Sequence, residues 1–180
     1  MLKRSFAAFT LLVLFSALAS AQVKPPKTVR DFFMALPDDY FSLDCCIYKR
    51  SYRQAKIEYL KRYLMVEDTA NGFLSGGGEA AQDGFEMALF KRADGSYLIG
   101  FFTFGEGGLE DTPWTVFLDY KNGKWTDVSK SVVPDYSKEK YEYHLPRRGT
   151  TIQVYRKVEE GDPPKMYDLI WDRARFVKKE

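Results

Sequence analysis

The sequence predicts an α+β protein in which one or two N-terminal helices pack on a mainly antiparallel β-meander. Apolar residues recur with helical spacing only in the early part of the chain, up to about residue 62. From about Tyr63 the hydrophobic pattern changes to a period of two, which is typical of half-buried strands. The connections between these segments are short, which favours antiparallel neighbours. Helices followed by a run of strands is the α+β order.

The first helix is expected over residues 28 to 36. Thr28 is a good N-cap residue, and Asp31 three positions later completes a capping pattern. Pro37 cannot continue the helix, so it should end at Leu36. The apolar face of this helix is made by Val29, Phe32, Phe33 and Leu36.

A second helix is expected over residues 50 to 62. Its pattern is less regular, because charged residues interrupt the apolar face. That face combines Tyr52, Ala55 and Tyr59 with the intruding Arg53 and Lys56.

Ten strands are expected after the helices. Asn122-Gly123 is a strong hairpin signal, because both residue types accept a positive φ. We expect Ser129 to cap one short helical turn before Pro134, and residues 75 to 83 to form a glycine-rich loop. The strands are expected over residues 63–68, from 73 onward, and over 85–91, 97–104, 114–120, 124–128, 141–145, 151–158, 166–171 and 175–177.

The first 21 residues read as a cleavable signal peptide. Lys3 and Arg4 form the basic region, residues 6 to 18 are apolar, and Ala19-Ser20-Ala21 is a small-residue cleavage site. The apolar run is shorter than the ~20 residues that a membrane span needs. We therefore expect an exported protein, periplasmic or secreted, whose mature chain begins near Gln22 and has no transmembrane segment.

The mature chain suits one domain. With residues 1 to 21 removed, 159 of the 180 residues remain, which is an ordinary size for a single domain over residues 22 to 180. A division into two sheets or lobes near residues 105 to 111 is left open. Residues 1 to 21 carry two basic and no acidic residues, so the mature chain has 25 of each and no formal net charge. This balance argues against a nucleic-acid partner.

Cys45 and Cys46 are adjacent. After export they meet an oxidising environment, but neighbouring cysteines reach ordinary disulfide geometry with difficulty. The pair is either a strained vicinal disulfide with a redox role or two small, partly buried thiols. The absence of a second cysteine pair favours the second interpretation.

His144, Arg147 and Arg148 are the candidate ligand-binding residues. His144 is the only histidine and so the best candidate for a general base, although a solvent-facing strand histidine is the simpler interpretation. Arg147-Arg148-Gly149-Thr150 is the best candidate for contact with an anion, since arginine pairs with carboxylates and phosphates. The alternative is a polar turn between two strands.

No catalytic residue, metal site or cofactor is expected. One histidine and two adjacent cysteines cannot supply the spaced ligands of a zinc site, and the acidic pairs lack the spacing of a calcium loop. The run of residues 75 to 79 does not end in the Lys-Ser/Thr pair of a phosphate-binding loop, so we expect a flexible loop or a mobile lid there.

Several segments together resemble small exported proteins of unknown function from Bacteroidetes-like bacteria. The segments are FFMALPDDYF, DTANGFLSGGG, ALFKRADGSYLIG, FLDYKNGKWTDVSKSVVP, LPRRGTTI and YDLIWDRARF. The resemblance implies a bacterial envelope or secreted protein, and it implies no activity and no functional residues.

The expected function is that of a non-enzymatic binding or interaction module in the envelope, for a protein or a small-molecule ligand. The absence of catalytic motifs and the many aromatic residues favour this hypothesis. The alternative is a small periplasmic hydrolase, or another small-molecule enzyme, with a site near His144. Such an enzyme needs His144, a carboxylate and a nucleophile in one place.

Overall fold

The computed structural model describes residues 25–41, 43, 51–77, 83–105 and 113–179. These residues form two antiparallel sheets and a few short helices, so the mainly antiparallel α+β class is confirmed in outline. The expected signal peptide and Cys45-Cys46 lie outside the described residues. Among the residues that are described, no helix is long and apolar enough to cross a membrane.

Two helices come first, α1 (Val29–Ala35) and α2 (Tyr52–Tyr63). The expected capping box opens α1, because the backbone N–H of Asp31 donates to Thr28 Oγ1 at 3.1 Å and the Thr28 N–H donates to the Asp31 carboxylate at 3.0 Å. Helix α2 begins after Ser51. Lys56, which interrupts the apolar pattern of α2, is fully buried in the structure.

Ten strands and a single helical turn follow in the part of the chain that the structure describes. Sheet one contains β1 (Leu64–Asp68), β2 (Phe73–Gly76), β3 (Asp83–Lys91), β4 (Tyr97–Gly105), β5 (Trp114–Lys121) and β6 (Lys124–Asp127). Sheet two contains β7 (Tyr141–His144), β8 (Thr151–Arg156), β9 (Lys165–Trp171) and β10 (Phe176–Lys179). Helix α3 (Ser129–Val132) lies between the sheets in the chain. Within each sheet every strand pairs with its neighbour in sequence.

The chain passes from sheet one to sheet two between β6 and β7. Strands β4 and β5, which flank residues 105 to 111, pair with each other in sheet one, for example at Leu98 and Asp119. The change of sheet therefore falls at residues 128 to 140 rather than near 105 to 111.

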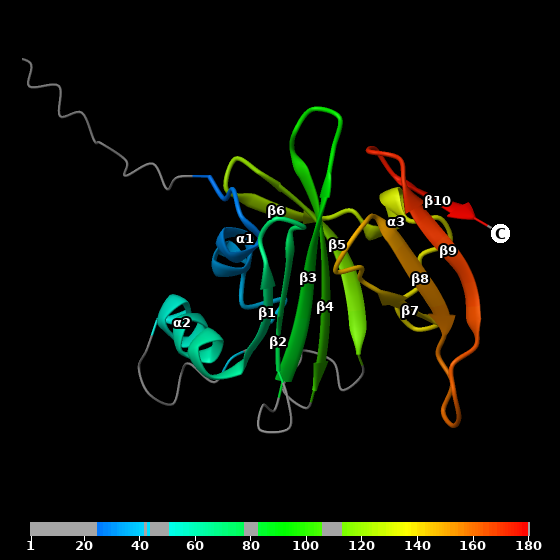
Figure 1. Cartoon of the computed structure of the whole chain (residues 1–180), viewed down its shortest axis with the longest axis horizontal. Helices are drawn as coiled ribbons and strands as arrows, with labels where there is room; N and C mark the ends of the chain where they lie inside the picture. The colour runs from blue at the N-terminus through cyan, green and yellow to red at the C-terminus, as the bar shows by residue number, and fades with distance from the viewer. Residues whose placement is uncertain (1–24, 42, 44–50, 78–82, 106–112, 180) are drawn as a thin grey trace, which may run out of the picture.

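Sheet one is the middle layer of three (Figure 1). One of its faces packs against α1 and α2, and the other packs against sheet two and α3. The buried residues of the first interface are Val29, Phe32, Phe33, Leu36, Phe41, Tyr59, Leu60, Leu74, Phe85, Met87, Ile99, Phe101, Val116 and Leu118. Those of the second are Phe73, Ala88, Phe90, Leu98, Phe117, Val132, Val133, Tyr143, Leu145, Ile152, Val154, Leu169, Trp171 and Phe176.

Two glycine positions explain local features of this arrangement. At the β5–β6 hairpin, Asn122 and Gly123 have φ values of 53° and 79°, as expected for the turn. In the middle of β4, a Cβ atom on Gly100 would lie 2.9 Å from Leu145 Cδ2. Gly100 thus lets sheet two approach sheet one closely.

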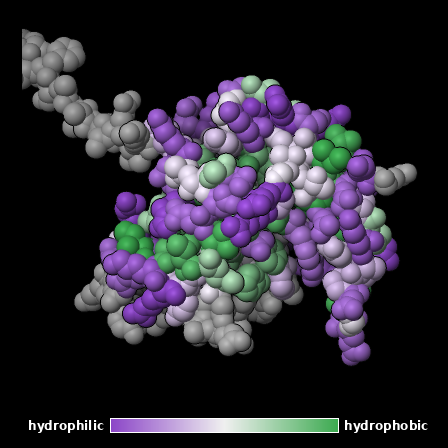
Figure 2. All heavy atoms as spheres, viewed as in Figure 1, coloured by the Kyte–Doolittle hydropathy of each residue, from purple (hydrophilic) through white to green (hydrophobic). Residues whose placement is uncertain are grey.

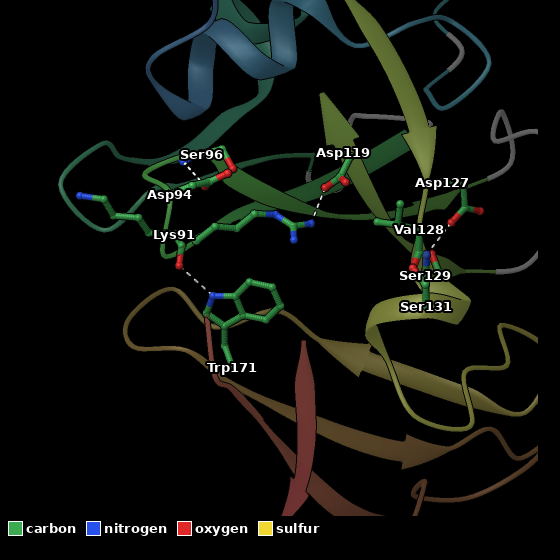
Figure 3. A network of polar contacts seen from close by, with 10 residues as sticks. Lys91, Asp94, Ser96, Asp119, Asp127, Val128, Ser129, Ser131 and Trp171 are labelled. Carbon is green, nitrogen blue, oxygen red and sulfur yellow. Dashed lines mark hydrogen bonds and ion pairs between the residues drawn. The ribbon is translucent and has the colours of Figure 1, made fainter. Parts of the chain in front are cut away.

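Two local expectations are corrected. Residues 75, 76 and 83 belong to strands, so the glycine-rich loop is shorter than expected, and residues 78 to 82 lie outside the described part. Ser129 does not cap α3 but is its first residue, and its Oγ accepts a hydrogen bond from the Phe117 N–H at 2.8 Å. Asp127 instead accepts from the Ser129 N–H at 2.8 Å (Figure 3).

The surface differs between the two sheets. The side shown in Figure 2 is mainly hydrophilic over sheet two, whereas hydrophobic groups gather over α2, β1 and β2. On β1, Leu64 and Met65 are 37% and 65% exposed. This edge strand of sheet one therefore carries much of the apolar surface.

Candidate functional site

Arg147 connects the two sheets. It lies in the loop between β7 and β8, and its Nε is 3.4 Å from Asp68 Oδ2 at the end of β1. The pKa of Asp68 lies below its ordinary value, chiefly because Asn71 donates a hydrogen bond to it, with a further contribution from Arg147. Arg147 is thus already paired with a carboxylate within the chain.

Arg148, the next residue in the loop, differs from Arg147. Its side chain is exposed and makes no ion pair with the described part of the chain. Thr150, at the end of the same loop, lines a separate cavity beside the β3–β4 turn. The structure therefore does not bring Arg147, Arg148 and Thr150 together as a single anion site.

His144 is the last residue of β7 and is largely exposed. Its ring stacks on Tyr155 of β8, with centroids 4.5 Å apart, and its Nε2 lies 3.6 Å from Glu142 Oε2. The expectation of a solvent-facing strand histidine matches this position.

Glu86 is a half-buried carboxylate without a partner among the described residues. It lies on β3, and it forms no ion pair or hydrogen bond with any described residue. Burial raises the pKa of Glu86 above its ordinary value, and the electrostatic effect of His144 opposes this rise. An unpaired carboxylate held away from water is costly unless a ligand compensates it.

Aromatic and small residues lie around Glu86. Ser75 on β2 and Phe102 on β4 are its register partners, so the three side chains share one face of sheet one. Phe104 lies further along the same face, 39% exposed, with its ring 5.6 Å from that of Phe102. A Cβ on Gly84 would lie 2.1 Å from the Phe104 ring, so the glycine lets this ring lie directly on the sheet.

We refer to Asp68, Glu86, His144 and Arg147 as the junction site. It combines a carboxylate that has no partner in the described part of the chain, an exposed imidazole and an ion pair between the two sheets. Such an arrangement can accept hydrogen bonds from an amine or a hydroxyl group, while Phe102 and Phe104 offer apolar contact or a cation–π face.

Sequence reasoning identified His144 and Arg147 but missed Glu86. A signal for it was present, because Glu86, Ala88 and Phe90 alternate along β3 and so point to the face that sheet two partly covers. A carboxylate on an otherwise apolar strand face is a candidate for a function.

The three tryptophans are spread through the fold. Trp125 donates from Nε1 to the carbonyl oxygen of Ala35, and Trp171 donates to that of Lys91. Trp114 Nε1 is buried and has no acceptor among the residues that the structure describes. In the described residues no three His, Cys, Asp or Glu side chains gather as a metal site would require.

The described residues define an α+β protein with a six-stranded and a four-stranded antiparallel meander, and the Arg147–Asp68 ion pair links the two sheets. Comparison of the chain with protein families, with curated proteins and with solved structures gives no match.

Proposed function

We propose that this chain is an exported protein of a bacterial envelope and that its mature domain, beginning near Gln22, is a non-enzymatic binding module. Its partner is a small molecule or a protein segment that presents an amino group or another hydrogen-bond donor. The observation that carries the proposal is Glu86, a half-buried carboxylate without a cation among the described residues.

Two features support this assignment. The aromatic side chains of Phe102 and Phe104 flank the carboxylate, and Phe104 is exposed enough to touch a ligand. The Arg147–Asp68 ion pair connects the loop beside His144 to β1, which supports a site that is formed before a ligand arrives. A ligand amine would restore the hydrogen bonds and the charge that Glu86 lacks.

Thermal unfolding in the presence of candidate ligands tests the proposal. The panel contains polyamines, amino sugars, cell-wall peptides and lipids, with neutral analogues of each. A ligand at about 100 times its dissociation constant adds about 2.7 kcal/mol to the free energy of unfolding, or roughly 5 to 10 °C. Glu86→Gln should abolish the shift, whereas Glu58→Gln on helix α2 should keep it. Amine ligands that shift both variants equally would refute the site.

Export is tested separately. Intact-mass measurement of the protein from the cell envelope should give a chain that starts near Gln22. A full-length protein retained in the cytoplasm would contradict this part of the proposal.

A hydrolase remains the second candidate because the hydroxyl of Ser75 lies beside Glu86 and His144 acts on the same carboxylate. These three groups are the types that acyl transfer uses. Ester and amide hydrolysis by the purified protein tests the idea, with His144→Ala and Ser75→Ala as variants. Activity that both substitutions remove would favour the enzyme, and activity unchanged in His144→Ala would exclude this mechanism.

A further inference from the structure

A groove lies between the last strand of sheet two and helix α3. Residues 130 to 134, from α3 and the loop after it, form one wall, and residues 175 to 178, which include most of β10, form the other. The groove has a volume of about 380 Å³. Figure 1 shows α3 and β10 beside each other.

The groove follows the free edge of β10. This strand is the outermost one of sheet two and pairs only with β9. The side chains of a strand alternate between its two faces. A groove that touches four consecutive residues therefore runs along the edge of the strand and not over one face.

The register shows which backbone groups lie on this edge. The Trp171 N–H donates to the loop before β8, so the backbone of Trp171 faces β8 and that of its neighbour Ile170 faces β10. Ile170 is the register partner of Val177, so Val177 bonds to β9. The N–H and C=O groups of Phe176 and Lys178 point to the free edge and form no hydrogen bond with a described residue. Unpaired groups of this kind are a template for another strand.

Apolar residues line much of the groove beside this edge. Val132, Val133 and Phe176 are buried core residues, and Pro134 is partly exposed. Val177, on the opposite face of β10 from Phe176, is 45% exposed. A strand added to β10 would bury its own apolar side chains against these residues.

The charged residues that line the groove are all cations, namely Lys130, Arg175 and Lys178. Lys178 pairs with Asp135 at 2.6 Å, whereas Lys130 and Arg175 are exposed and form no ion pair with a described residue. Residues 173 to 179 contain four basic and no acidic residues. Two copies of this edge would bring like charges together, so the charges disfavour self-pairing and favour an acidic strand.

We propose that the edge of β10 binds an extended, acidic segment of another protein as an added strand. The backbone groups of Phe176 and Lys178 pair with the segment, and its acidic side chains lie near Lys130 and Arg175. This surface is separate from the junction site, and the proposal does not depend on the function assigned to Glu86.

Fluorescence anisotropy with a labelled peptide of alternating valine and glutamate tests the charge preference. The acidic peptide should bind the purified protein, and a peptide with lysine in place of glutamate should not. Lys130→Gln/Arg175→Gln should weaken binding about threefold or more. Lys121→Gln/Lys124→Gln, which removes the same charge from exposed positions of the β5–β6 hairpin, should leave binding within about twofold. Unchanged melting temperatures in both variants show that the fold is intact.

Amide hydrogen exchange measured by NMR locates the bound peptide. Exchange at the Phe176 and Lys178 amides should slow, while that at Val177 and Lys179, which already bond to β9, should stay the same. If neither peptide binds, if both bind equally, or if the two edge amides gain no protection, the proposal is wrong. A dimer in sedimentation that protects these two amides without peptide would also overturn it, because a second copy would then occupy the edge.

Discussion

The side-chain nitrogen of Lys56 in α2 lies 2.7 Å from the carbonyl oxygen of Phe33 in α1. Lys56 also donates to the carbonyl oxygen of Leu36, and its Nζ lies 4.4 Å from the centre of the Tyr52 ring. A fully buried lysine thus satisfies the C-terminal carbonyl groups of a neighbouring helix, where a positive charge also suits the helix dipole.

Replacement of Lys56 by methionine should lower the free energy of unfolding by about 1 to 3 kcal/mol, because two buried carbonyl groups lose their donor. Methionine keeps the apolar stem, so little packing is lost. Urea unfolding at neutral pH measures the effect. Lys61→Met, at an exposed position of the same helix, is the control and should stay within about 0.5 kcal/mol. Equal stability of the two variants would contradict the capping role.

The same lysine predicts a pH dependence. Burial lowers the pKa of Lys56 to about 7, from 10.5 in its ordinary state. Between pH 7 and pH 10.5 the unfolded chain keeps a proton on Lys56 that the folded chain has released. The contribution of Lys56 to the free energy of unfolding therefore rises with pH, by up to about 1.4 kcal/mol per pH unit. Below pH 7 both states are protonated and the dependence disappears.

Unfolding of the original protein and of Lys56→Met across this pH range isolates the effect of the lysine. The difference in free energy between them should widen in favour of the original protein as pH rises from 7 towards 10.5. A difference that stays constant across the range would mean that the pKa of Lys56 is not lowered.

Glu86→Gln should raise the melting temperature at neutral pH. Because burial raises the pKa of Glu86, the folded state favours the protonated form, and stability falls as pH rises from the ordinary value of 4.5 through the raised one. Glutamine removes this cost while keeping the shape. The gain should vanish below pH 4.5, where Glu86 is protonated in both states. A melting temperature that is unchanged or lower at neutral pH would show that the carboxylate is compensated.

Trp125→Phe should destabilise the protein by about 1 to 3 kcal/mol. The indole Nε1 donates at 3.0 Å to the carbonyl oxygen of Ala35, so phenylalanine leaves this acceptor at the end of α1 without a donor. Tyr97→Phe is the matched control, since Tyr97 also packs against Phe32 but forms no hydrogen bond through its hydroxyl with the described residues. Chemical denaturation compares the two variants. Equal losses would mean that packing, not the hydrogen bond, sets the effect.

The local elements could be predicted because short-range signals determine them. Thr28 and Asp31 identify the start of α1, and Asn122-Gly123 identifies the β5–β6 turn. The alternation of apolar residues located the strands to within a few residues. In each case the residues that decide the structure are neighbours in the sequence.

The candidate site could be predicted only in part. His144 and Arg147 stand out by residue type. Asp68, which pairs with Arg147, lies on the other sheet and 79 positions away, and Glu86 also lies on that sheet. The burial of Lys56 depends likewise on the end of α1. Such pairings follow from how the layers pack, which no local pattern encodes.

The sequential pairing of strands has a consequence for assembly. Sheet one is complete by residue 127, before any strand of sheet two has been synthesised. A nascent chain of that length would present one face of Phe73, Phe90 and Phe117 to water, without the cover that sheet two supplies. Until the last four strands arrive, this face is a binding surface for chaperones and a route to aggregation, so completion of the C-terminal third protects the whole molecule.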